Sequence, residues 1–386
     1  IKELWNTSPI FHGVFIMSMA LWGTVLGSLF GSIPCDKIGR KNTLIWIGIL
    51  FFVSALGSAI AWDPYSFSFF RFIGGIGVGA STVASPTYIS EISNKESRGR
   101  LVALYQFNIV FGILIAYFSN YLLQGIGGDI DWRYMLGIEA IPAVVYILFV
   151  SKVPNSPRWL ILFRGDEKKA KEILKQIYPD SEISRRIKQI KNSVEKKNSL
   201  QIESKSKNKT KKIPIWAYVV MLILVMIIGS EYLGIYLFVP FFPWLAKKLI
   251  NTPIFSGLFN FQISLAFLIA FFNQLSGINF VLYYAPEILQ SAGLAASDSL
   301  MSSVSIGFVN LVFTMFGLRL IDKYGRRYLM KIGSIGYIMS LISIGVCFIY
   351  SLNSYLLLAF ILLFIASHAI GQGTVIWVFI SEIFPN

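Results

Sequence analysis

Long apolar segments separated by short polar stretches recur along the whole of this 386-residue chain. A helix needs about 20 residues to cross a bilayer core of roughly 30 Å, and most of these segments have that length. Short alternating strands are not seen in the pattern. It therefore predicts an all-α polytopic membrane protein with spans at roughly 11–35, 42–62, 66–90, 101–123, 133–152, 256–285, 299–320, 329–350 and 355–380.

The same pattern divides the chain into four parts. Residues 1–152 form the N-terminal half, and residues 251–386 form the C-terminal half. Between them, residues 153–213 are a basic loop with an amphipathic helical pattern around "DEKKAKEILKQIY". Residues 214–250 are an apolar insertion. Lysines flank its core, 214–246, on both sides, which favours a short hairpin with both ends on one face of the membrane. A single interfacial helix is the alternative.

Composition and charge agree with a membrane protein. Hydrophobic residues make up 55% of the chain and charged residues 14%, against roughly a quarter charged in soluble domains. The net charge is +14, and 18 of the 34 Lys and Arg residues lie between Lys152 and Lys212. Basic loops mark the cytoplasmic side, so the charge records topology in the cell membrane rather than a nucleic-acid partner. Cys35 and Cys347, far apart in sequence, indicate no disulfide framework.

Two sequence motifs occur twice, in the same order. "GSIPCDKIGRK" and "GLRLIDKYGRR" share Gly, four residues, then Asp-Lys-x-Gly-Arg and a basic residue, and Asp322 follows Asp36 by 286 positions. "ISEI" is also repeated, and Glu382 follows Glu91 by 291 positions. Parallel duplication of a multi-span unit is the architecture of the major facilitator fold, which we therefore predict, with two pseudo-symmetric helical halves.

These motifs predict a latch on the cytoplasmic side of each half. The basic residues that follow the glycine turn can meet the glutamate at the end of a later helix, as Arg40 or Lys41 with Glu91. Such ion pairs can form in one transport state and break in the other. The alternative is the ordinary positive charge of a cytoplasmic loop. The predicted gate residues are Asp36, Arg40, Glu91, Arg98, Asp322, Arg326, Arg327 and Glu382.

Across almost its whole length, the chain resembles the sugar porter family of the major facilitator superfamily. The motifs are "RFIGGIGVGAS", "SPTYISEISNKESRGRL", "DWRYMLGIEAIPA", "VPNSPRWL", "NQLSGINFVLYYAPEIL" and "WVFISEIFP". Within the family it is most similar to the bacterial proton-coupled xylose transporters. The resemblance implies transport of a monosaccharide by alternating access, with a proton as co-substrate. It also implies that the family's first span precedes residue 1 and that its last two spans follow residue 386.

The stretch "NQLSGINFVLYY" is unusually polar for a membrane segment. Amide side chains both donate and accept hydrogen bonds, which suits sugar hydroxyls, and they avoid the cost of burying a charge. Gly277 can loosen the helix so that Gln274 and Asn279 face one cavity. Amides that hold helices together are the alternative. The candidate sugar ligands here are Asn273, Gln274, Asn279 and Tyr283.

Further sugar contacts come from the resemblance alone. It implies Gln106 from the first half and Asn310 and Trp377 from the second, although simple helix packing is an alternative for the tryptophan. One departure is notable. The family usually has two consecutive glutamines where this chain has Asn273 and Gln274, and asparagine is one methylene shorter.

Proton coupling is expected to involve Arg71 and Glu139. In proton-coupled relatives, an aspartate of the first span pairs with the arginine at the position of Arg71, and that aspartate would lie outside this chain. Glu139 is the one carboxylate well inside a span of the first half. A carboxylate at that depth can carry a proton, or it can be an inert packing residue.

Other classes of function fit less well. The two histidines are far apart, and the sequence contains no HExxH motif, P-loop or carboxylate pair placed for glycosidic chemistry. We therefore expect neither an enzyme nor a bound metal or cofactor. A passive sugar or polyol facilitator and a sugar receptor built on a transporter fold stay open as alternatives. The pattern does not identify the sugar or the oligomeric state.

Overall fold

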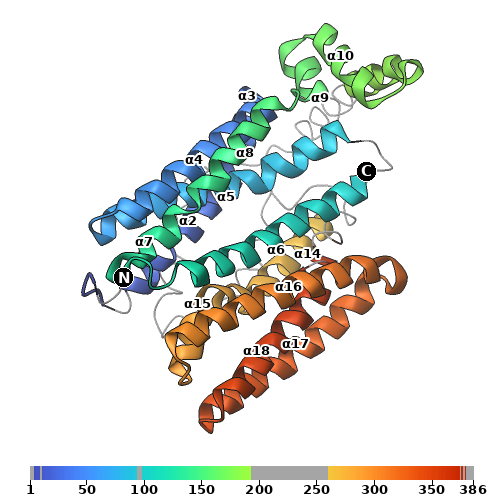
Figure 1. Cartoon of the computed structure of the whole chain (residues 1–386). Coiled ribbons are helices and arrows are strands. Elements are labelled where there is room, and N and C mark those ends of the chain that lie inside the picture. Colours follow the sequence, from blue (N-terminus) through green and yellow to red (C-terminus); the bar gives the residue numbers. More distant parts are fainter. Residues whose placement is uncertain are drawn as a thin grey trace, which may run out of the picture. The chain divides into compact units, whose positions relative to one another are not determined.

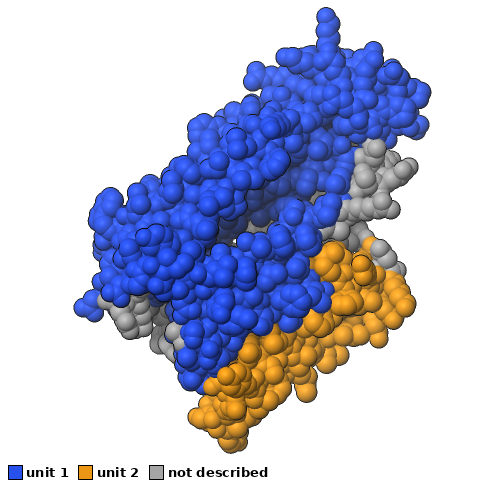
Figure 2. All heavy atoms as spheres, in the orientation of Figure 1, with its two compact units in different colours: residues 1–195, 286–312 blue, residues 196–285, 313–386 orange. Residues whose placement is uncertain are grey.

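The computed structural model describes residues 4–8, 11–93, 98–192 and 260–373, together with 375, 376 and 379. Every regular element in these residues is a helix. The chain forms two compact units, and Figure 2 draws them in blue and orange. Unit 1 contains residues 1–195 and 286–312, and unit 2 contains residues 196–285 and 313–386. The division of the chain into four parts that the sequence suggests stays a prediction.

The N-terminal half consists of helices that run back and forth along one another (Figure 1). One of its short helices is a π-helix, η1, and one is a 3-10 helix, η2. In order they are η1 (His12–Met17), α2 (Met19–Phe30), α3 (Ser32–Lys37), α4 (Arg40–Ile60), α5 (Pro64–Ile92), α6 (Arg98–Leu123), η2 (Gly128–Ile130), α7 (Asp131–Gly137) and α8 (Ala140–Lys152).

The first part of the basic loop folds into short helices. They are α9 (Pro157–Trp159), the π-helix η3 (Leu160–Arg164), α10 (Glu167–Ile177) and a further helix over 180–192. Helix α10 is strongly amphipathic, and it buries Ala170 and Leu174 on one face. The helical pattern predicted around "DEKKAKEILKQIY" is therefore confirmed, while the insertion 214–250 lies outside the described residues.

The C-terminal half begins, within the described residues, at Asn260. Its elements are α14 (Asn260–Leu275), α15 (Ile278–Ser291), α16 (Ala296–Tyr324), α17 (Arg326–Ile349), α18 (Ser354–His368) and the π-helix η4 (Ala369–Gly373). Over the part of the chain that the structure describes, seven helical segments are long and apolar enough to cross a membrane. This agrees with the polytopic architecture predicted from the sequence.

Two of the predicted spans are each interrupted by a short break, although residues 128–152 taken together are long and apolar enough to cross a membrane, as predicted. The span at 11–35 contains α2 and α3, and the span at 133–152 contains α7 and α8. A proline lacks an N–H and its ring clashes with the carbonyl four residues earlier. Helix α2 ends at Phe30, four residues before Pro34, and the second break begins at Ile138, four residues before Pro142. Each interruption thus has a local cause.

The N-terminal end of α5 is defined by a cap. Asp63 accepts hydrogen bonds from the backbone N–H groups of Tyr65 and Ser66, at 2.8 and 3.0 Å, and Pro64 occupies the first helical position. These hydrogen bonds favour the charged carboxylate and hold the pKa of Asp63 below its ordinary value.

Helices α2 and α5 approach each other through glycines. A Cβ atom added to Gly27 would clash with the carbonyl oxygen of Ile76, and one added to Gly79 would clash with the carbonyl oxygen of Thr24. Gly23 and Gly75 lie in the same contact. Without side chains between them, the two backbones touch directly, as small residues allow in membrane helices.

We predict that Gly27→Ala destabilises the protein, because the new methyl group forces α2 away from α5. Overpacking of this kind costs about 1–3 kcal/mol. Gly112→Ala is the matched control, since an added Cβ on that α6 glycine meets no other atom within 4 Å. Thermal unfolding of the purified protein in detergent measures both. Equal unfolding midpoints for the two variants would contradict the glycine contact.

Candidate functional site

Arg40 is the centre of a buried polar cluster in unit 1. Its Nε lies 3.0 Å from Glu91 Oε2, and its Nη1 lies 3.1 Å from Asp36 Oδ1. The same Nη1 donates a hydrogen bond to the carbonyl oxygen of Cys35. The side chains of Arg40 and Glu91 are only 9% and 7% exposed, so two charges face each other away from water. The contact expected between them is present, and its role as a gate stays a prediction.

The segment "PNSPRWL" covers this cluster from the loop. Ser156 donates a 2.5 Å hydrogen bond to Glu91 Oε2 and accepts one from the backbone N–H of Trp159. The indole N–H of Trp159 donates to the carbonyl oxygen of Asp36 at 2.9 Å, and its ring lies against Gly39. No partner for this segment is predicted from the sequence. The signal that could have indicated one is a tryptophan inside an otherwise polar loop. Ser156 and Trp159 are therefore additions to the predicted site.

The repeated motif folds into the same turn in both halves. Gly39 has φ 92° and ψ 156°, and Gly325 has φ 80° and ψ 158°, a region that favours glycine. The arginine after each glycine donates a hydrogen bond to the carbonyl oxygen five residues earlier, Arg40 at 3.0 Å and Arg326 at 3.3 Å. The duplication read from the sequence is thus repeated in backbone and side-chain geometry.

The other predicted gate residues are less fully described. Arg98 begins α6 and Asp322 lies near the end of α16, and their side chains are outside the described part of the chain. Arg327 is exposed at the start of α17. Glu382 lies outside the described residues, and so does its predicted contact with Arg326 or Arg327.

The amide-rich stretch lies at a break between α14 and α15. The break centres on Gly277, whose φ is +83°. Across it, Asn279 Nδ2 donates a 2.8 Å hydrogen bond to Gln274 Oε1. Ser276 closes the end of α14 by donating its hydroxyl to the carbonyl oxygen of Asn273 at 2.6 Å. The loosened helix therefore brings Gln274 and Asn279 together, with the glutamine side exposed.

Asn273 forms its side-chain hydrogen bond with a different helix from the one that Gln274 contacts. It is 9% exposed, and its Oδ1 lies 3.1 Å from Nε2 of His368, which is 6% exposed at the end of α18. Four residues further along, Gln372 in η4 donates to Ser334 Oγ at 2.6 Å. The sequence pattern links none of these pairs, because each joins helices that are distant along the chain.

The remaining sugar candidates come from several helices. Gln106 is half-buried on α6, Asn310 is buried on α16, and Tyr283 is exposed on α15. Helices α6 and α16 contact each other at Gly307, where an added Cβ would lie 3.0 Å from an α6 backbone atom. Trp377 lies outside the described residues. All seven sugar-contact assignments, with Asn273, Gln274 and Asn279, stay predictions.

Arg71 and Glu139 are close enough to interact electrostatically. Arg71 is half-buried on α5, and Glu139 stands at the break between α7 and α8. At this break the carbonyl of Ile138 accepts a short-range bond from the N–H of Ile141. The two predicted proton-coupling residues thus lie on different helices of unit 1. Their role stays a prediction.

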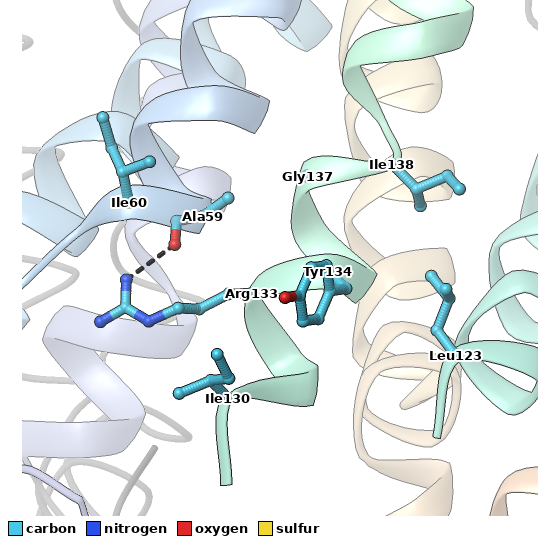
Figure 3. A pocket seen from close by; sticks show the side chains of 8 residues that line it. All are labelled: Ala59, Ile60, Leu123, Ile130, Arg133, Tyr134, Gly137 and Ile138. Atoms are coloured by element: carbon cyan, nitrogen blue, oxygen red, sulfur yellow. Dashed lines mark hydrogen bonds between the residues drawn. The ribbon is translucent and has the colours of Figure 1, made fainter. Parts of the chain in front are cut away.

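A cavity of about 460 Å³ opens beside α7 and the C-terminal ends of α4 and α6 (Figure 3). Its lining is mostly apolar, and Arg133, its one charged residue, donates a 2.7 Å hydrogen bond to the carbonyl oxygen of Ala59. It contains none of the predicted sugar ligands. The lining residues are Ala59, Ile60, Leu123, Ile130, Arg133, Tyr134, Gly137 and Ile138.

Within the described residues, no group of three or more His, Cys, Asp and Glu side chains is placed to hold a metal ion. The polar clusters of unit 1 pair cations with carboxylates and carbonyl oxygens. In unit 2, amide side chains pair with each other, with a serine and with histidine. Such amide groups suit a neutral, hydroxyl-rich ligand.

Comparison with known proteins gives a consistent result. The family model described as "Sugar (and other) transporter" matches residues 11–255 and 247–386. The D-xylose-proton symporter of Escherichia coli strain K12 is 30% identical, over 96% of this chain and 70% of that protein. The arabinose-proton symporter of Bacillus subtilis is 32% identical, over 100% and 74%. The glucose facilitated diffusion protein of Zymomonas mobilis is 30% identical, over 96% and 70%.

A solved structure supports the same relationship. The xylose transporter of E. coli in a partially occluded inward-open conformation superimposes with a TM-score of 0.72 at 27% identity. The match covers 98% of this chain and 82% of that one. The predicted major facilitator fold is therefore confirmed.

We predict that Glu91→Gln strongly destabilises the protein, because it leaves the buried guanidinium of Arg40 opposite a neutral group. Removing one partner of a buried pair costs about 3–5 kcal/mol. Adding Arg40→Leu to this variant should cost less than the sum of the single changes, since the stranded charge is gone. The midpoint of thermal unfolding measures all three variants.

The control is Glu167→Gln, which breaks an ion pair with Lys191 whose side chains are about half exposed. Exposed pairs contribute at most about 1 kcal/mol. If the Glu91 and Glu167 variants unfold at the same temperature, the cluster around Arg40 does not stabilise unit 1 as its burial implies.

Proposed function

The chain belongs to the sugar transporter family, and from this membership we propose that it carries a pentose or hexose, xylose-like in size, together with a proton. It is a multi-pass membrane protein of the major facilitator fold, and it is a transporter rather than an enzyme. Two relatives that match nearly all of the chain are named as pentose–proton symporters. Their substrates guide the choice of sugar to test.

The proposed sugar site is built around the break at Gly277. The hydrogen bond between Gln274 and Asn279 is the observation that carries the proposal, because it joins two amides across an interrupted helix. Each amide keeps a further donor or acceptor for a sugar hydroxyl. Tyr283, one turn beyond Asn279 on α15, would close over the bound sugar.

The rest of the site would come from α6, α16 and the segment after η4. Gln106 and Asn310 supply amides from helices that contact each other. Trp377 would offer an apolar face to the sugar ring and an N–H to a hydroxyl. With neutral partners throughout, the site can bind a sugar without burying a charge.

Alternating access needs contacts that differ between the two end states. We assign this role to the ion pair of Arg40 with Glu91, which Ser156 and Asp36 support in the first half. The equivalent turn at Gly325 and Arg326 would pair with Glu382 in the second half. Breaking these contacts would open the cytoplasmic side.

Proton coupling is assigned to Glu139 with Arg71. A carboxylate at a helix break can take up a proton when the guanidinium beside it moves away. Binding of the proton and of the sugar would then favour the same conformational change. The position of Glu139 at the break between α7 and α8, in the same unit as Arg71, supports the assignment.

The first test is uptake of labelled xylose and glucose in proteoliposomes, with and without an inward proton gradient. We expect xylose to accumulate above its external concentration, and a protonophore to collapse that accumulation. Competition between unlabelled sugars ranks the substrates. Empty liposomes are the control for leakage.

A passive facilitator is the second candidate, because one relative of similar identity is named as a facilitated diffusion protein. Uptake that only equilibrates and ignores the gradient would select it over symport. Absence of saturable uptake for both sugars would overturn sugar transport and lead to tests with polyols.

We further predict that Glu139→Gln abolishes proton-driven accumulation while sugar exchange at equilibrium continues, because glutamine cannot release a proton. Glu172→Gln is the matched control on exposed α10. Accumulation and exchange are measured in the same proteoliposomes. Undiminished accumulation by the Glu139 variant would remove this residue from the coupling mechanism.

A further inference from the structure

His368 is a buried histidine that the sequence does not connect with the sugar site. It is the last residue of α18, and its Nε2 lies 3.1 Å from Asn273 Oδ1. Both side chains are at most 9% exposed. The imidazole ring also lies 6.3 Å from the ring of Phe364, one turn earlier. The pair joins two positions 95 residues apart in unit 2.

The chemistry of the two side chains determines which of them donates the hydrogen bond. An amide oxygen only accepts, so the hydrogen bond requires a proton on Nε2 of His368. The oxygen of Asn273 is therefore engaged within the protein. The side-chain oxygen of the neighbouring Gln274 is also engaged within the protein, because it accepts a hydrogen bond from Asn279. One hydrogen bond fixes the end of α14, and the other crosses the break to α15.

The backbone next to His368 is held in place by close helix packing. The π-helix η4 follows directly and packs on α17, where Gly333 and Gly371 meet so closely that a Cβ on either would lie about 2.5 Å from the other's Cα. Helices α17 and α18 lie side by side (Figure 1). The end of α18 is therefore a rigid anchor for Asn273.

We propose that His368 is a positioning residue for sugar recognition. By holding Asn273, it fixes the last turn of α14, and with it Gln274 and Asn279, in the arrangement that binds the sugar. The position of these two amides then sets how well a pentose is bound relative to a hexose. This inference rests on the proposed function.

The shorter side chain at position 273 fits this arrangement. A glutamine there would be one methylene longer, and its amide would not fit the same 3.1 Å contact without displacing the ring of His368. Asn273 thus acts as the link between the histidine and the sugar-facing amides. Gln274 and Asn279, which are more exposed than Asn273, are left to contact the sugar.

The test measures xylose and glucose affinity by calorimetry on the full protein in nanodiscs. His368→Phe removes the N–H donor and keeps a ring against Phe364, and His368→Gln restores a donor. Asn273→Leu removes the acceptor. Ser334→Ala is the matched control, since it breaks a partly buried hydrogen bond between α17 and η4 without touching His368 or Asn273.

We expect His368→Phe and Asn273→Leu each to weaken xylose binding about tenfold, the effect of one lost hydrogen bond. Both should also change the ratio of xylose to glucose affinity. The double variant should bind no more weakly than either single variant, because they remove the same interaction. His368→Gln should recover most of the affinity, and Ser334→Ala should leave both affinities unchanged.

The thermal unfolding midpoints of the variants distinguish a positioning role of His368 from a simple packing role. Lower midpoints with unchanged affinities and an unchanged sugar ratio would overturn the inference and make the pair a helix-packing contact. If His368→Phe does not fold, Asn273→Leu and His368→Gln decide by the same criteria. An unaltered protein that binds neither sugar would overturn the proposed function and this inference together, whereas unaltered binding in every variant would overturn the inference alone.

Discussion

A peptide group in hydrocarbon has no water with which to form hydrogen bonds, and this constraint governs the whole molecule. It explains why every regular element among the described residues is a helix. It also makes each interruption of a helix costly, so an interruption persists where side chains and short-range bonds satisfy the freed groups. At the break after Leu275, the Ser276 hydroxyl satisfies the carbonyl of Asn273, and at Ile138 the carbonyl accepts a bond from the N–H of Ile141.

The interruptions are also where the chemistry is concentrated. Glu139 stands at one break, the amides around Gly277 at another, and His368 at the transition from α18 to η4. In soluble proteins, polar groups of this kind can be placed on loops. In a membrane protein the break itself supplies the irregular backbone that lines a site. The cytoplasmic cluster around Arg40 is different, since its turn is regular and is repeated at Arg326.

The sequence predicts much of the fold, because apolar length and basic loops are local signals. The extents of α4, α17 and the duplicated turn follow from them. The length of an apolar segment does not show whether its helix is interrupted, although Pro34 and Pro142 mark two of the interruptions. The contacts that complete the site could not be predicted in this way. Ser156 with Glu91 and Trp159 with Asp36 join residues 65 and 123 positions apart, and no local spacing relates them.

The glycine contact between α2 and α5 has a mechanical consequence. Backbones that touch directly have little freedom to slide or rotate, because a small shift drives carbonyl oxygens into neighbouring atoms. The two helices therefore move together as one rigid body where they touch. Arg71 and Glu91 are 20 residues apart on α5, roughly 30 Å along the helix. The glycine contact covers only the part of α5 from Phe72 to Ala80, so a tilt of α5 next to Arg71 carries α2 with it, while Glu91 lies beyond the contact.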